Sequence, residues 1–274
     1  MPTVMPPDFP RLAPGAGTFF PQPSLSLSAA FGEQLSSLYG LVQRSGHVFG
    51  SPLGPFKGQA RSLHLPRFVY FGPEASDASV RLAFLAGFDH RDLRGTLSLL
   101  HFVEQLALKP DLGQRLNLSV FPLIDVLGLA SLAGERGLAS RSWVRTDAPE
   151  LQLLEKDARL SGYHGFIRLE TVSGDDAVTA RLRSSSHVEN PTPGVELINS
   201  EDFTPFAVRW ETVPTAEPED GPLTVSADLP FQPFELTLRL PAAWSPDLHR
   251  RATASILKRF VLRYRGFIAY GQHL

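Results

Sequence analysis

One stretch of the chain, residues 82–128, constrains the fold more than any other. It contains an apolar run, LAFLAGFD, then a segment with helical spacing, TLSLLHFVEQLAL, and then a second apolar run, LNLSVFPLID. Short apolar runs that end in Gly, Pro or Asp and alternate with a helical pattern predict parallel strands joined by a crossover helix. Ligands of such sheets bind beyond the carboxyl ends of the strands, so residues 89–92 and 125–128 are where we expect a site.

The other patterns extend this unit into a single α/β domain over residues 24–274. Apolar residues at helical spacing predict a helix from Leu27 to Val42, another that opens at Pro149, and an amphipathic closing helix from Leu248 to Tyr264. Residues 175–222 are rich in proline and charge and offer one strand candidate, Phe206–Trp210. Further strands are predicted at residues 47–49, 62–65, 68–71, 165–172 and 234–240. We therefore predict a mixed, mostly parallel twisted sheet with helices on both faces.

Composition and the N-terminal segment limit the setting in which this protein works. Residues 1–23 contain seven prolines and predict an irregular arm before the domain. They lack the basic start and apolar centre of a signal peptide, and no apolar run approaches the ~20 residues of a membrane span. The net charge is −2 and there is no cysteine. These features predict a cytoplasmic protein that binds neither nucleic acid nor a membrane and uses no thiolate chemistry.

The segment AGFDHRDLRG, residues 86–95, resembles the zinc-binding loop of the zinc carboxypeptidases and their deacylase relatives, succinylglutamate desuccinylase and aspartoacylase. In that family the loop reads roughly Ala-Gly-Ile-His-Gly-x-Glu-x-x-Gly, and its His and Glu bind zinc. Gly87 and Gly95 are in register with it, but Asp89 occupies the position of the His and Asp92 that of the Glu.

The resemblance continues in order along the chain. Asp125, in PLIDVLG, occupies the position of the Asn in the family's Pro-x-x-Asn-Pro-x-Gly turn. Arg136 and Arg145 fall where the family has arginines, which implies that they bind a substrate carboxylate, with Asp125 beside them. Glu170 stands where a strand delivers the second histidine ligand, and Arg239 stands at the position of the catalytic glutamate.

The family holds zinc by two histidines and a glutamate, and a further glutamate takes a proton from the bound water. The corresponding set here is Asp89, Asp92 and Glu170, with Arg239 as the base. Arginine stays protonated and cannot act as a base, so we expect neither zinc nor hydrolysis, and no cofactor. Arg239 is then expected to take the place of the metal among three carboxylates. The alternative is a Mg, Mn or Zn ion at the same carboxylates.

Three functions remain open at this point. The first is an inactive carboxypeptidase-like protein that binds a small carboxylate or peptide ligand. The second is an active metal-dependent hydrolase with a carboxylate-rich site. The third is a scaffold for a protein partner, with the basic face of the closing helix as one candidate surface. A loop histidine is ordinarily solvated, so His90 is expected to point into water rather than to bind a metal.

Overall fold

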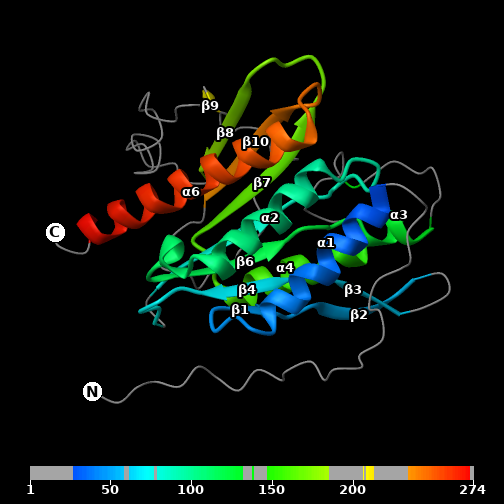
Figure 1. The fold of residues 1–274 in the computed structure, drawn as a ribbon, viewed down its shortest axis with the longest axis horizontal. Coiled ribbons are helices and arrows are strands. Elements are labelled where there is room, and N and C mark those ends of the chain that lie inside the picture. Colours follow the sequence, from blue (N-terminus) through cyan, green and yellow to red (C-terminus); the bar gives the residue numbers. More distant parts are fainter. Residues whose placement is uncertain are drawn as a thin grey trace.

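The computed structural model describes residues 27–58, 62–76, 79–131, 138, 147–184, 206, 208–212 and 234–271, and its largest element is an eight-stranded sheet (Figure 1). The strand order is β1-β4-β6-β5-β7-β10-β8-β9. The proline-rich arm predicted at residues 1–23 lies outside the described residues. The strands are β1 (Val48–Gly50), β4 (Phe68–Phe71), β5 (Val80–Leu85), β6 (Leu116–Phe121), β7 (Gly165–Val172), β8 (Val178–Ser184), β9 (Val208–Thr212) and β10 (Phe234–Pro241).

The four central strands, β6, β5, β7 and β10, are all parallel to one another. Toward one edge, β4 pairs antiparallel with β6 and β1 antiparallel with β4. Toward the other edge, β8 pairs antiparallel with β10, and β9 is parallel to β8. A separate two-stranded ribbon is formed by β2 (Leu53–Lys57) and β3 (Ser62–Leu65). The prediction of a mixed, mostly parallel sheet in one α/β domain is confirmed.

Helices cover the sheet on both faces. In Figure 1, α1 (Leu27–Val42), α2 (Arg94–Leu108) and α6 (Pro246–Gly271) lie in front of the sheet, and α4 (Pro149–Ser161) lies behind it. The chain leaves β5 through α2 to reach β6 on one side, and after β6 it returns past β5 to β7. Right-handed crossovers in opposite directions place their helices on opposite faces. A 3₁₀ turn, η1 (Pro110–Gly113), follows α2, and the short α3 (Val126–Ser131) follows β6.

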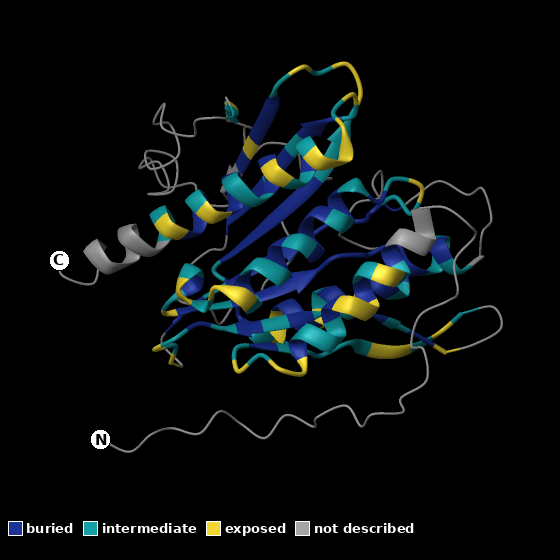
Figure 2. Ribbon diagram, viewed as in Figure 1, coloured by how far each residue is buried: buried dark blue, intermediate teal, exposed yellow. Residues whose placement is uncertain are grey.

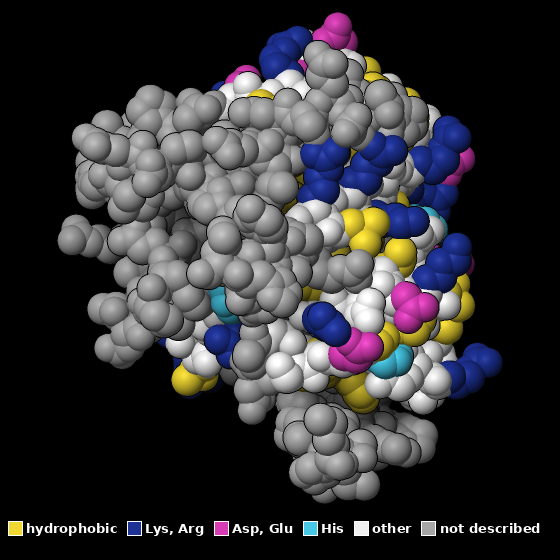
Figure 3. All heavy atoms as spheres, turned by 90° about the vertical axis from the view of Figure 1, so that its left-hand side faces the viewer, with side chains coloured by type: hydrophobic (Ala, Val, Ile, Leu, Met, Phe, Trp, Pro, Cys, Tyr) yellow, Lys and Arg dark blue, Asp and Glu magenta, His cyan; other side chains and the backbone are white. Residues whose placement is uncertain are grey.

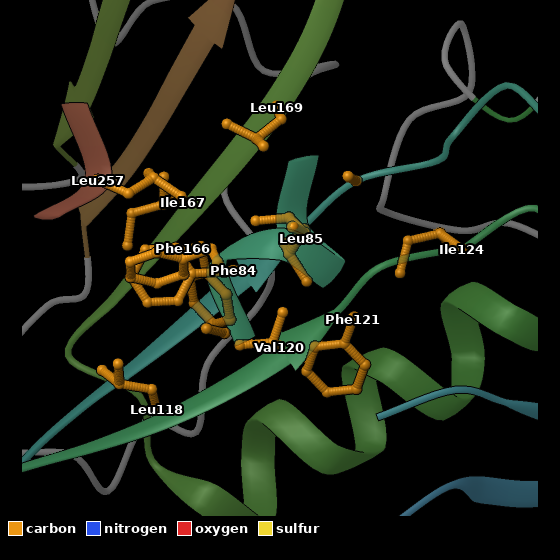
Figure 4. Packing of buried hydrophobic residues seen from close by; sticks show 14 of the residues in the cluster. Phe84, Leu85, Leu118, Val120, Phe121, Ile124, Phe166, Ile167, Leu169 and Leu257 are labelled. Carbon is orange, nitrogen blue, oxygen red and sulfur yellow. The ribbon is translucent and has the colours of Figure 1, made fainter. Parts of the chain in front are cut away.

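The central strands are apolar on both sides because helices cover both faces. Phe84, Leu118 and Ile167 are fully buried, and Figure 4 shows side chains of β5, β6 and β7 packed together. Figure 2 shows the same centre as continuously buried, with the exposed residues on helix surfaces and loops. This rigid centre holds the carboxyl ends of β5, β6 and β7 in fixed positions.

The closing helix α6 is amphipathic, as its spacing predicts. Ala252, Ile256 and Phe260 are buried against the core, whereas Arg251 and Lys258 are exposed. Figure 3 views the molecule from the side toward which the carboxyl end of α6 points, and Lys and Arg side chains are prominent among the described residues there. Within the described part of the chain, no helix combines the length and apolarity needed to cross a membrane.

Candidate functional site

The candidate site lies at the point where the strand order reverses. β5 has β6 on one side and β7 on the other, and the loops that follow these strands meet beyond their carboxyl ends. The loops after β5 and β6 are tied together by backbone bonds, since Asp125 N–H donates to the carbonyl of Gly87 at 2.8 Å. Gly87 has φ of +68°, and a Cβ there would lie 2.9 Å from the carbonyl oxygen of Pro122. Glycine is therefore required for this close approach.

Asp125 and His90 form a buried pair between these two loops. The Asp125 carboxylate accepts the backbone N–H of His90 at 3.1 Å and lies 2.6 Å from His90 Nδ1. In the metal-free arrangement Nδ1 donates this hydrogen bond, because a carboxylate can only accept. The side chains of His90 and Asp125 are only 11% and 6% exposed. The expectation that His90 is solvated is therefore wrong, because the turn after β6 supplies a buried partner.

Gly128 allows this pair to form. Its N–H donates to Asp125 Oδ1 at 3.1 Å. A Cβ at this position would lie 2.2 Å from His90 Nδ1 and 2.5 Å from either oxygen of Asp125. The ends of both side chains would have to shift to make room for it. The spacing Asp125-x-x-Gly128 was the one local signal in the sequence for this close approach.

Asp89 completes a group that can hold a metal ion. Arg91 binds it through both Nε and Nη2, at 2.8 and 2.6 Å, and these hydrogen bonds hold the pKa of Asp89 below its usual value. The carboxylate is therefore ionised at neutral pH. One ligand atom each from Asp89, His90 and Asp125 can be chosen so that all three lie within 4.8 Å of one another. Two carboxylates and an imidazole suit Zn²⁺ or Mn²⁺ better than Mg²⁺.

Asp92 is held by a different arginine, close to the start of α2. Arg94 Nε donates to it at 2.8 Å and Nη2 at 2.9 Å, and Arg94 also bonds the carbonyl of Ala242 after β10. Burial acts to raise the pKa of Asp92, but hydrogen bonds from Arg94 and Thr171 outweigh it and leave the pKa below its usual value. Asp92 thus works as an anchor between α2 and the end of β10.

Glu170 on β7 lies beside two arginines. Arg168 Nε is 2.8 Å from its Oε1, and Arg239 Nε, delivered from β10, is 3.9 Å from its Oε2. The Cα atoms of Arg239 and Glu170 are register partners in the parallel β7–β10 ladder. The guanidinium of Arg168 also stacks over the ring of Phe88, 4.1 Å from its centroid. The nearer and more buried cation for Glu170 is therefore Arg168, which the sequence interpretation did not single out.

These contacts correct the expected role of Arg239. One guanidinium was predicted to serve three carboxylates, whereas in the structure Asp89 pairs with Arg91, Asp92 with Arg94 and Glu170 mainly with Arg168. Arg136 and Arg145, the expected carboxylate-binding arginines, lie outside the described residues.

Solved structures show what this fold resembles. A metallo-carboxypeptidase from Burkholderia cenocepacia superposes with a TM-score of 0.65 at 16% identity, over 86% of this chain and 69% of that one. The chain has the metallo-carboxypeptidase fold. A metallo-carboxypeptidase from Pseudomonas aeruginosa (TM-score 0.54, 15% identity, 86% and 69% covered) and an aspartoacylase family protein from Mesorhizobium loti (TM-score 0.54, 14% identity, 78% and 67% covered) share it. No protein-family model and no curated protein matches the sequence.

The expectation that this protein needs no cofactor is corrected by the same findings. Its structural neighbours include metallo-carboxypeptidases, and Asp89, His90 and Asp125 form a group with the donors and the spacing for a metal ion. The expectation went wrong because it considered only the positions that align with the family's ligands. The turn after β6 brings Asp125 to His90, and neither residue belongs to the set Asp89, Asp92 and Glu170 that was predicted.

Proposed function

We propose that this protein binds a divalent metal ion through Asp89, His90 and Asp125 and uses that site to hold a carboxylate-bearing peptide or amino acid. The observation that carries the proposal is the buried His90–Asp125 pair, which orients the imidazole beside the ionised Asp89. When bound there, the ion would polarise a carbonyl or carboxylate oxygen of the ligand. Arg136 and Arg145 remain the proposed contacts for the ligand's carboxylate on the strength of the family resemblance.

We propose further that the hydrolytic step of the carboxypeptidases is lost. Their mechanism needs a carboxylate base beside the metal, and the equivalent strand here carries Arg239. A guanidinium does not release its proton near neutral pH, so it cannot activate a water molecule. The Pseudomonas aeruginosa structure contains (2-guanidinoethylmercapto)succinic acid, a dicarboxylate, which supports a carboxylate as the class of ligand.

A second candidate function, metal-dependent hydrolysis of an amide, is supported by the metal group itself. A metal-bound water can reach a pKa near 7, so it needs less help from a base than free water does. Release of amino acid from N-acyl amino acids by the metal-loaded protein would favour this function over binding alone.

The metal proposal is tested with Gly128→Ala, which places a methyl group where His90 and Asp125 meet. Titration of the metal-free protein with Zn²⁺ and Mn²⁺ in a calorimeter should give one site per chain in the wild type. We expect at least tenfold weaker binding in the variant, because second-shell and ligand changes of this kind typically cost 10- to 100-fold in affinity.

The matched control is Gly95→Ala, a glycine of the same region whose Cβ would have ordinary contacts of 3.5 Å or more. It should bind metal like the wild type. Equal metal affinity in all three proteins, or no binding by the wild type, would contradict the proposed site.

A further inference from the structure

Arg239 and Arg168 flank the same carboxylate, but they are held very differently. The side chain of Arg168 is 9% exposed, lies within hydrogen-bond distance of Glu170 and stacks on Phe88. The side chain of Arg239 is 26% exposed, and its nearest approach to Glu170, 3.9 Å, is too long for a hydrogen bond. Within the described part of the chain, Arg239 has no hydrogen bond that would occupy its guanidinium.

The charged groups around Glu170 include one more guanidinium than carboxylates. Arg91 neutralises Asp89 and Arg94 neutralises Asp92, each through two nitrogens. The remaining trio contains two guanidinium groups, those of Arg168 and Arg239, and only one carboxylate, that of Glu170. Arg168 is the closer and more buried of the two arginines, so Arg239 is the cation with the looser contact and the more exposed side chain.

Arg239 lies at the same edge of the sheet as the metal group. Arg239 and Glu170 are register partners close to the carboxyl ends of β10 and β7. Phe88, on which Arg168 stacks, directly precedes Asp89 in the loop that carries the metal group. Both the metal group and Arg239 therefore lie toward the carboxyl ends of the parallel strands.

We propose that Arg239 is an anion receptor that binds a carboxylate of the ligand. The position that carries a catalytic base in the carboxypeptidases would then carry a ligand-binding residue in this protein. The planar fork of a guanidinium accepts a carboxylate through two parallel N–H···O bonds, which its loose contact with Glu170 leaves available. This inference rests on the proposed function, because it concerns the same site and ligand class. It adds the residue that selects for negative charge.

The experiment measures binding of succinate to the full chain by calorimetry, with the uncharged succinamide as the comparison ligand. The wild type should bind succinate and not succinamide, with an affinity that falls as salt is added. Arg239→Met should bind succinate at least tenfold more weakly, the effect expected for loss of a charge-assisted hydrogen bond. Glu170→Gln should bind as tightly as the wild type or a few-fold more tightly, because a competing carboxylate is gone.

Arg181→Met is the matched control, since Arg181 lies on the same sheet in an exposed pair with Glu211 and should not affect binding. Unchanged succinate binding by Arg239→Met, or none by the wild type, would overturn the inference. The Zn²⁺ titration of the same proteins separates this failure from failure of the proposed function. Loss of succinate binding with intact Zn²⁺ binding assigns the effect to Arg239, whereas absence of Zn²⁺ binding in the wild type refutes only the metal proposal.

Discussion

The shared carboxylate of Glu170 allows a sharp test of which arginine stabilises the fold. Arg168→Met keeps an unbranched apolar chain against Phe88 and removes the guanidinium that lies 2.8 Å from Glu170. Breaking one side of a fully buried ion pair costs roughly 3–5 kcal/mol. The side chain of Glu170 is 29% exposed and can recover some hydration, so we expect a loss of about 2–3 kcal/mol. For a chain of this size that corresponds to a decrease in Tm of roughly 5–10 °C.

Arg239→Met is the matched variant, because it removes the same group from the neighbouring strand. Its guanidinium is 3.9 Å from Glu170 and partly exposed, which is the setting of pairs that contribute under ~1 kcal/mol. Urea unfolding and thermal melts of the wild type and both variants at pH 7 give the comparison. Equal losses in both variants, or a larger loss for Arg239→Met, would refute the reasoning and restore Arg239 as the main counter-ion of the site.

Two further predictions concern buried polar groups outside the proposed metal group. Burial, and to a smaller extent the nearby Arg94, lower the pKa of His249 to about 4. As the pH falls, the imidazole therefore takes up a proton in the unfolded state before it does so in the folded state. The free energy of unfolding should decrease between about pH 6.5 and pH 4. By pH 5 the free energy of unfolding should be lower than at pH 7 by roughly 1–2 kcal/mol. Urea unfolding at the two pH values should show that His249→Leu removes this decrease. The same pH dependence in the variant as in the wild type would contradict the prediction. Asp157, buried and paired with Arg67, should cost about 2–3 kcal/mol of unfolding free energy when changed to Asn, and a loss within ~0.5 kcal/mol would show that the pair is not structural.

The sequence was sufficient for the elements that carry a strong local pattern. The apolar residues at helical spacing between Leu27 and Val42 lie on α1, although the expected stop, Gly46, is four residues beyond its end. The strand predicted at residues 165–172 has the bounds that the structure gives it. The strand β8 was missed although Val178, Ala180 and Leu182 alternate inward, because proline and charge dominate the region around it. The short helix α3 was also missed, since six residues are too few to show a helical period.

The candidate site was predicted only in part. The sequence indicated the correct loops, because parallel strands must end at the same edge of a sheet. It assigned His90 to solvent because the partner of this side chain comes from another loop. It also overlooked Arg168, although its partner Glu170 lies two residues further along the same strand. Asp125, the partner of His90, is 35 residues further along the chain, and no local pattern links them.

Local periodicity and turn residues, which are properties of consecutive residues, determined by themselves the α/β class, the parallel centre of the sheet and the edge at which chemistry is expected. The tertiary structure alone decided which distant segments of the chain meet at this edge. Strand register placed Arg239 opposite Glu170, and the close approach at Gly128 joined Asp125 to His90. Such contacts depend on distances of a few ångströms between segments that only the packed core brings together. The ion pairs that stand in place of the predicted carboxylate cluster are instead local, since each joins two residues that are two positions apart in the chain.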